Sequence, residues 1–338
     1  MTEQAQDAVP SGVIYPDVLH PMRDSSDKCE NAPELKQRLA EDGYLLFRDV
    51  LDKDKLLALR AKITDVLAEV RWIAGGAEKM KAKVTGLAYR EGEDRYFDAH
   101  DKLVRLEELY ALAHDENLIR LMRNALGDSA FPHPLSITRL VFPGHPEITT
   151  PPHQDYRNNQ GTTNLTASWI PLGDCRQQEG GLAVLEGSHR CGLLPIQYHL
   201  GPGNRGVVLP PAAKAMRWVS TDFRLGDVLL FPALTVHSAL HNADPDHMRL
   251  SVDFRFQLEG EGVSPVCLEP HFGRYSWEEI YADWQSDQYK YYWKSKRYLP
   301  VQWDPTLLKL ENDPIKQLYH DGMKFHKARN ERLRKRQG

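Results

Sequence analysis

The chain has 338 residues, of which 41% are hydrophobic and 27% are charged, and its formal net charge is −4. This composition is typical of a globular protein that is long enough for one large domain or two small ones. The slightly acidic balance gives no overall basic field for binding nucleic acid. No stretch approaches the roughly 18–20 apolar residues that span a membrane.

The N-terminus lacks the basic segment and the apolar segment of a secretion signal. The cysteines are scattered and form no Cys-x-x-Cys pair, so we expect reduced thiols rather than disulfides or a zinc knuckle. Together these features predict a cytoplasmic protein. The cysteines are Cys29, Cys175, Cys191 and Cys267.

Residues 1–32 carry Pro, Ser, Asp and Gly without periodicity, which predicts a flexible N-terminal arm. After Pro33 the pattern favours a short helix that runs into a first strand at 43–48. A longer amphipathic helix follows, and either Asp52 or Asp54 is its N-cap.

Residues 75–100 begin with a Gly-Gly break and are polar and mixed in charge. Such a segment is either a surface connection or a lid over a site, because long loops in compact domains often act as lids. Both interpretations stay open. Helices are then predicted at about 102–113 and 115–126, with Asp115 capping the second.

From Leu135 the pattern changes to short segments rich in β-branched and aromatic residues, separated by Gly, Pro and Asn. About eight such strands suit a closed or two-sheeted antiparallel barrel, with the early helices bracing one sheet from outside. The predicted fold class is therefore mainly β with flanking helices. The strands are expected at 135–142, 152–157, 164–171, 181–185, 206–209, 216–219, 227–236 and 248–257.

We expect residues 33–260 to form this domain and residues 261–338 to form an aromatic-rich helical extension packed on it. Ser276 and Glu279 fit a capping box. Aromatic residues at helical spacing favour a helix packed on the scaffold; a wall of the substrate site or a dimer contact is the alternative. The oligomeric state, monomer or homodimer, is left open.

The segment 151–155 carries the first chemical signal. On an extended backbone, side chains two apart share a face, so His153 and Asp155 can reach one metal ion while Gln154 points away. An imidazole and a carboxylate placed in this way are two of the three ligands of a 2-His-1-carboxylate Fe(II) site. By itself this pair is a weak signal, because a second His-x-acid pattern occurs at 145–147.

A second segment supplies a third ligand. Residues 227–236 resemble an apolar strand, with His237 at or just past its end. The next strand, 248–257, alternates, and Arg249 and Ser251 lie on its polar face. That face lies either toward water, as in a half-exposed strand, or toward a barrel interior. In the second case the arginine fork and the serine hydroxyl would hold a dicarboxylate.

In this order the motifs resemble those of the phytanoyl-CoA dioxygenase family of Fe(II)/2-oxoglutarate oxygenases. The resemblance implies a double-stranded β-helix (jelly-roll, cupin-like) barrel that uses Fe(II), 2-oxoglutarate and O2. It also implies oxidative decarboxylation of 2-oxoglutarate to succinate and CO2, coupled to C–H oxidation, most often hydroxylation, of a small or mid-sized metabolite. The motifs are Pro152-His153-Gln154-Asp155, Ala167-Ser168-Trp169-Ile170-Pro171-Leu172, the run 179–189, and the segment 237–251.

The 5-carboxylate of a buried 2-oxoglutarate needs a buried cation, and Arg249 meets that need with help from Ser251. The resemblance adds Trp169 as a residue that lines the cofactor site, and it places Arg139 near the 2-oxoglutarate. The predicted metal ligands, which are also the predicted catalytic residues, are His153, Asp155 and His237.

His241 competes with His237 as the third ligand, and we favour His237, which lies at a strand end and gives Arg249 the offset usual in the family. The alternative function is a cupin-like metal-binding module without oxygenase turnover, and a third is a dioxygenase that uses no 2-oxoglutarate. The arginine–serine pair favours the oxygenase, because a structural metal site has no use for a dicarboxylate clamp. The expected partner is a small-molecule substrate, without nucleic acid or membrane.

Overall fold

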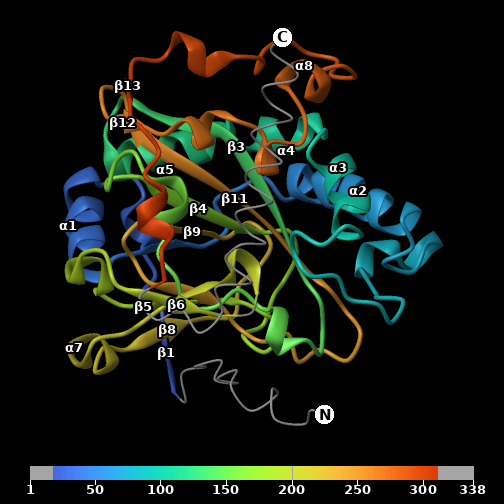
Figure 1. The fold of residues 1–338 in the computed structure, drawn as a ribbon, viewed down its shortest axis with the longest axis horizontal. Helices are drawn as coiled ribbons and strands as arrows, with labels where there is room; N and C mark the ends of the chain where they lie inside the picture. The colour runs from blue at the N-terminus through green and yellow to red at the C-terminus, as the bar shows by residue number, and fades with distance from the viewer. Residues whose placement is uncertain (1–17, 200, 311–338) are drawn as a thin grey trace.

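The computed structural model describes residues 18–199 and 201–310, and two β-sheets form the centre of this part of the chain (Figure 1). The larger sheet is antiparallel throughout, in the order β2-β9-β4-β11-β3. Its strands are β2 (Leu45–Phe47), β3 (Ala130–Val141), β4 (Thr166–Pro171), β9 (Val228–Pro232) and β11 (Arg249–Leu258).

The smaller sheet has the order β1-β8-β5-β10, with β1 parallel to β8 and the other pairs antiparallel. Its strands are β1 (Leu19–Pro21), β5 (Leu182–Leu185), β8 (Trp218–Ser220) and β10 (His237–Ala239). Two further pairs are β6 (Ile196–Tyr198) with β7 (Arg205–Val207), and β12 (Gly262–Val263) with β13 (Leu299–Pro300).

The two large sheets face one another across an apolar layer. Trp169 and Phe231 of the larger sheet belong to one buried cluster with Val184 and Val219 of the smaller sheet. Because side chains alternate between the faces of a strand, the neighbouring residues of the larger sheet point the other way. The larger sheet is therefore buried on both faces.

Helices cover the outer face of the larger sheet. The apolar side chains Val252 and Phe254 of β11 share a buried cluster with Leu59 and Ile63 of α2. Figure 1 shows α1 on one side of the sheets and α2 to α4 on the other. The helices are α1 (Ala32–Asp42), α2 (Lys53–Glu69), α3 (Tyr96–Leu103), α4 (Glu107–Leu112), α5 (Glu116–Leu126), α6 (Tyr156–Asn159), α7 (Pro211–Lys214) and α8 (Trp277–Ile280).

The helix signals in the sequence are confirmed in part. The Asp52 side chain accepts hydrogen bonds from the backbone N–H groups of Asp54 and Lys55, so Asp52 is the N-cap of α2. Asp115 caps α5 as predicted. The single helix predicted at 102–113 is wrong, because α3 ends at Leu103 and α4 begins at Glu107.

Two predicted strands around the site also differ. The strand expected at 152–157 is reduced to a bridge at His153, followed by the short helix α6. The strand expected at 227–236 ends at Pro232, where a turn closes with a hydrogen bond from Thr235 N to Pro232 O. The chain then re-enters a sheet at β10, in which His237 is the first residue. A turn thus separates the apolar strand from the histidine.

Both ends of the described chain pack on this core. Leu19–Pro21 pairs with β8, so the described part of the predicted flexible arm is tied to a sheet; residues 1–17 lie outside the described residues. The Ser276–Glu279 capping box is present, and Trp284 Nε1 donates to Arg105 O at 2.9 Å. The division at residue 260 stays a prediction, and residues 311–338 of the extension lie outside the described residues.

The architecture is therefore mainly β with flanking helices, as predicted. Hydrogen-bond pairing among the described residues forms two separate large sheets rather than one closed barrel. Within the same ranges no helix combines the length and the apolar character needed to cross a membrane. All four cysteines are free thiols, as predicted.

Candidate metal centre

A pair of backbone hydrogen bonds places His153 and His237 side by side. His153 N donates to His237 O at 2.9 Å, and His237 N donates to His153 O at 3.1 Å. The two ring centroids are 4.1 Å apart. Because β10 is itself paired with β5, the sheet fixes the position of both imidazoles.

Both imidazoles have the same orientation. Nδ1 of His153 lies 2.8 Å from Pro151 O, and Nδ1 of His237 lies 3.0 Å from Thr235 O. A carbonyl oxygen can only accept, so each Nδ1 carries the hydrogen and each Nε2 keeps its lone pair. This is the tautomer that a metal-binding histidine requires, with the ring held by a hydrogen bond from its other nitrogen.

The carboxylate of Asp155 completes the cluster. Its Oδ1 lies 3.7 Å from Nε2 of His153 and 3.9 Å from Nε2 of His237. The ligand atoms of the three residues all lie within 4.8 Å of one another. Two imidazoles and one carboxylate on one side of a site form the donor set that holds Fe(II) and leaves positions open for other ligands.

The backbone reaches this arrangement by a turn and not by the predicted extended strand. Asp155 has helical dihedral angles (φ −62°, ψ −29°) and starts α6. Gln154 points away, as predicted: its amide donates to Leu234 O and Gly192 O, and its oxygen accepts from Leu194 N. The three hydrogen bonds of Gln154 hold the turn in place.

Burial sets the charge state of the two histidines, and a neighbouring arginine sets that of Asp155. It lowers the pKa of His237 to about 3 and also lowers the pKa of His153, so both rings are neutral near pH 7. Burial by itself raises the pKa of Asp155, but the positive charge of Arg255, with a smaller contribution from Arg139, outweighs it and keeps that pKa below its ordinary value. A neutral imidazole and an ionised carboxylate are the forms that bind metal.

Arg249 is a buried cation with no acidic partner of its own. Its side chain is 6% exposed, and it forms no ion pair among the described residues. Nε donates to Gly180 O at 2.8 Å, and a second nitrogen donates to Ser251 Oγ. The guanidinium also lies over the Trp169 ring, 5.5 Å from its centroid. Burial lowers the pKa of Arg249 to about 10.

The hydrogen bond from Arg249 to the Gly180 carbonyl depends on a glycine at position 180. Its φ of +82° lies in the left-handed region that glycine favours, and a Cβ there would lie 3.2 Å from Cβ of Asn242. The backbone can therefore bring the Gly180 carbonyl up to Arg249. Trp169 adds a buried Nε1 that has no hydrogen-bond partner in the protein. These residues fit the acid group of a dicarboxylate.

The polar face of β11 lies inside the protein and not toward water. Arg249, Ser251, Asp253 and Arg255 are 6%, 0%, 5% and 3% exposed. Asp253 pairs in register with Trp169, which belongs to the layer between the two sheets. Of the two interpretations of this strand, the structure therefore supports the interior one.

Arg139 is engaged by two carboxylates. Its Nε lies 3.2 Å from Asp253 Oδ1, and its Nη1 lies 3.3 Å from Glu91 Oε2. It lines a pocket together with Arg249. The expected role of Arg139 near 2-oxoglutarate stays a prediction.

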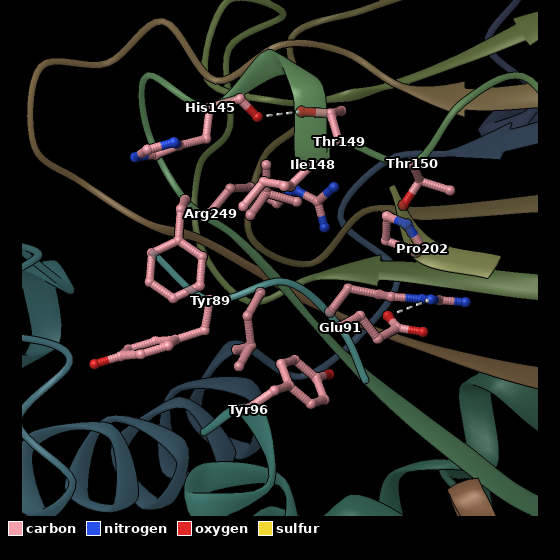
Figure 2. Close-up of a pocket in the computed structure, with 13 residues that line it drawn as sticks. Tyr89, Glu91, Tyr96, His145, Ile148, Thr149, Thr150, Pro202 and Arg249 are labelled. Carbon is pink, nitrogen blue, oxygen red and sulfur yellow. Dashed lines mark hydrogen bonds and ion pairs between the residues drawn. The ribbon is translucent and has the colours of Figure 1, made fainter. Parts of the chain in front are cut away.

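Residues of the 75–100 segment form one wall of this pocket. Figure 2 shows Tyr89, Glu91 and Tyr96 on one side, with Arg249 and Thr150 opposite them. Tyr89 stacks on Trp72 with a centroid distance of 4.6 Å. The segment thus lies over the pocket, whereas its closing as a lid stays a prediction.

Sequence reasoning missed the role of Arg255. Its Nε lies 2.9 Å from Asp155 Oδ2, and its Nη1 lies 2.9 Å from Asp253 Oδ2. The alternation of side chains along the strand could have revealed it. Arg255 lies on the same face of its strand as Arg249, so an inward-facing Arg249 predicts an inward-facing Arg255. His241 belongs to none of the metal-ligating clusters found among the described residues.

One other such cluster, Asp244, Asp246 and His247, is less buried. Asp244 Oδ1 already accepts from the backbone N–H groups of Asp246 and His247 and contacts the His247 ring. This cluster is a hydrogen-bonded turn.

Comparison with known proteins agrees with this geometry. Residues 39–250 match the family model described as phytanoyl-CoA dioxygenase (PhyH). The 1-deoxypentalenic acid 11-beta-hydroxylase of Streptomyces arenae is 27% identical over 254 residues, which cover 69% of this chain and 85% of that protein. The protein of the same name from Streptomyces exfoliatus is 26% identical over 250 residues, with the same coverage.

Two solved structures that resemble this chain are less similar to it in sequence than the Streptomyces proteins are. The non-heme alpha ketoglutarate dependent carbocyclase SnoK from nogalamycin biosynthesis is 20% identical with a TM-score of 0.48, covering 72% of this chain and 89% of that one. EctD from S. alaskensis is 20% identical with a TM-score of 0.47, covering 71% and 81%. The family match spans most of the chain and includes all three clustered ligands and Arg249. The chain therefore belongs to the phytanoyl-CoA dioxygenase family and is a 2-oxoglutarate-dependent oxidoreductase that uses Fe(II) and O2.

Proposed function

We propose that this enzyme hydroxylates a small or mid-sized metabolite at a C–H bond. In this proposal His153, Asp155 and His237 hold Fe(II). Arg249, assisted by Ser251, binds the 5-carboxylate of 2-oxoglutarate, and Trp169 lines the same site.

The observation that carries the proposal is the unpaired charge of Arg249. A buried cation is costly unless an anion accompanies it. Here the protein supplies only a carbonyl, a hydroxyl and an aromatic ring, which leaves part of the guanidinium fork for a carboxylate. A purely structural metal site would not need this group, and a dioxygenase without 2-oxoglutarate would not need it either.

The chain's own residues prepare the site for the cofactors. The two backbone carbonyls hold the imidazoles with Nε2 toward the metal, and burial keeps the rings neutral. When bound, Fe(II) and 2-oxoglutarate supply the oxidative chemistry, in which 2-oxoglutarate yields succinate and CO2 and one oxygen atom becomes available to a substrate C–H bond. Asp155, His237 and Arg249 are 3%, 4% and 6% exposed, so bulk water has little access to them.

Hydroxylation as the outcome is supported by the relatives. Both Streptomyces proteins are named as hydroxylases of 1-deoxypentalenic acid, a small molecule. The fold proposed with this function is a double-stranded β-helix, which the two facing sheets support. Residues 33–260 would carry the active site, and residues 75–100 would close over it.

The test measures succinate from 2-oxoglutarate with Fe(II) and ascorbate, with a panel of metabolites as candidate substrates. We expect substrate-stimulated succinate in the native enzyme and a loss of about 100-fold or more in Arg249→Gln, since a hydrogen-bonded ion contact is worth about 3 kcal/mol. No succinate above background with any metabolite would favour the metal-binding module. Full activity of Arg249→Gln would favour a dioxygenase that uses no 2-oxoglutarate.

A further inference from the structure

The two oxygens of the Asp155 carboxylate face different partners. Oδ1 is the oxygen near Nε2 of His153 and of His237, at 3.7 and 3.9 Å. Oδ2 instead lies 2.9 Å from Nε of Arg255, in an ion pair whose angles fall outside hydrogen-bond geometry. Both side chains of this pair are nearly fully buried, at 4% and 3% exposure.

Arg255 is itself held from the other side. Its Nη1 lies 2.9 Å from Oδ2 of Asp253, whose Oδ1 lies 3.2 Å from Arg139. Asp253 and Arg139 lie on the paired strands β11 and β3, and Arg255 lies opposite Ala167 of β4, at the bulge that interrupts the pairing of β11 with β3. The guanidinium of Arg255 is therefore fixed between two carboxylates, and it cannot move away from Asp155 without leaving Asp253.

Because Oδ2 is paired with Arg255, only Oδ1 of Asp155 is available to a metal, and this limits how many coordination positions Asp155 would fill. Three protein atoms on one face of a six-coordinate ion leave three positions. The 1-carboxylate and keto oxygen of 2-oxoglutarate would take two of these positions, and the third would have to stay available for O2. An Asp155 that bound through both oxygens would occupy one of those three positions.

We propose that Arg255 is a positioning residue that keeps Asp155 a one-oxygen ligand by engaging its second oxygen. The inference rests on the proposed function, because it places the metal at the three-residue cluster. Arg255 acts through Asp155 and is not assigned a contact with substrate.

The experiment compares Arg255→Met, Arg255→Lys and the double variant Arg255→Met/Asp253→Asn, which removes one positive and one negative charge together. Each protein is loaded with Fe(II) without oxygen and titrated with 2-oxoglutarate. The metal-to-ligand charge-transfer absorption reports chelation, and calorimetry with Co(II) reports metal affinity. Arg217→Met is the matched control, because Arg217 forms an exposed ion pair with Glu186.

We expect Arg255→Met to bind Co(II) at least as tightly as the native protein, since both oxygens of Asp155 become available. Its affinity for 2-oxoglutarate should fall about 10- to 100-fold, or about 1.4 to 2.8 kcal/mol, because the second Asp155 oxygen would compete with a 2-oxoglutarate oxygen for one position on the metal. Arg255→Lys should recover part of that loss, and Arg217→Met should show none. A crystal structure of Co(II)-loaded Arg255→Met should show both Asp155 oxygens on the metal.

Native-like 2-oxoglutarate affinity in folded Arg255→Met, or in the double variant if the single one does not fold, would overturn the inference. So would a Co(II)-bound structure in which Asp155 still uses one oxygen. Asp155→Ala separates this failure from that of the proposed function. If Asp155→Ala retains native Co(II) affinity, the metal is not at this cluster and the proposed function fails as well.

Discussion

At the scale of single residues, the site depends on what each polar group does with its second functional atom. Each histidine uses Nδ1 on a carbonyl, which leaves Nε2 for a metal. Asp155 uses Oδ2 on Arg255, which leaves Oδ1. Arg249 uses two nitrogens on Gly180 and Ser251, which leaves the remaining donors for a ligand. The role of a residue in the site therefore depends on which of its polar atoms has no partner in the protein, as well as on its residue type.

His237→Ala should remove metal binding, whereas His241→Ala should not. His237 is 4% exposed and its Nε2 faces Asp155, so its loss takes one of three ligands from the cluster. We expect Co(II) affinity to fall at least about 100-fold, beyond the range for residues that merely orient a ligand. Calorimetric titration of the two variants decides between the two histidines; equal losses in both would contradict the assignment.

At the scale of elements, β11 contacts the covering helices with one face and the candidate metal centre with the other. One face of this strand, with Val252 and Phe254, packs under the helices, and the other, with Arg249 and Asp253, lines the site. The strand is paired with β3 on one side and with β4 on the other. Any shift of β11 by one residue would exchange the two faces, so helix packing and the site are fixed by the same register.

Helix α2, which packs on this sheet, should depend on its N-cap. Asp52→Ala removes the acceptor for two backbone N–H groups, and we expect the free energy of unfolding to fall by about 1 kcal/mol. Asp54→Ala is the control, since it removes only a charge in the first turn, worth roughly 0.3–1 kcal/mol at most. Urea unfolding of both variants measures the difference, and succinate formation should be unchanged in each. A larger loss in Asp54→Ala would place the N-cap two residues later, at Asp54.

At the scale of the whole molecule, the extension after residue 260 shares the helical core. Tyr281, Trp284 and Trp293 belong to the same buried cluster as the helices under the large sheet. His114, just after α4, stacks on Tyr289 with a centroid distance of 4.5 Å. The extension is thus packed through aromatic rings onto the helices that cover the larger sheet, and in Figure 1 it lies beside α4.

The burial of His114, which stacks on the extension, and of His133, which lies in β3, should make stability depend on pH. Burial lowers the pKa of both His114 and His133 to about 4, below the ordinary value of about 6.5 for an unfolded chain. Between these values the unfolded chain binds more protons, so stability falls as pH drops from about 6.5 toward 4 and is unaffected above that window. We expect a loss of about 1 kcal/mol or more by pH 5.

Urea unfolding at pH 7.5, 6 and 5 measures this loss. His114→Gln should flatten the dependence, because the amide does not titrate, even though the stack on Tyr289 is weakened at every pH. The free energy of unfolding could instead change with pH equally in the native protein, in His114→Gln and in His133→Gln. That result would show that neither ring is buried in its neutral form.

The sequence by itself determined which residues are the candidates for the site. His153, Asp155 and His237 were named from residue types and order, and Arg249 from alternation along a strand. Periodicity also predicted α1, α2 and α5, with Asp115 as the cap of α5 and either Asp52 or Asp54 as the cap of α2, because helix ends and apolar stripes are local properties of the chain. The resemblance to the family came from the same local motifs.

Only the tertiary structure decided how those residues meet. His153 and Asp155 converge through a turn and a bridge to β10, and not through the extended strand that their spacing suggested. Arg139 and Arg255 both pair with Asp253, yet their second partners differ: Glu91 for Arg139 and Asp155 for Arg255. Spacing along a chain fixes which residues share a strand face, whereas contacts between distant segments depend on how the sheets pair and face one another.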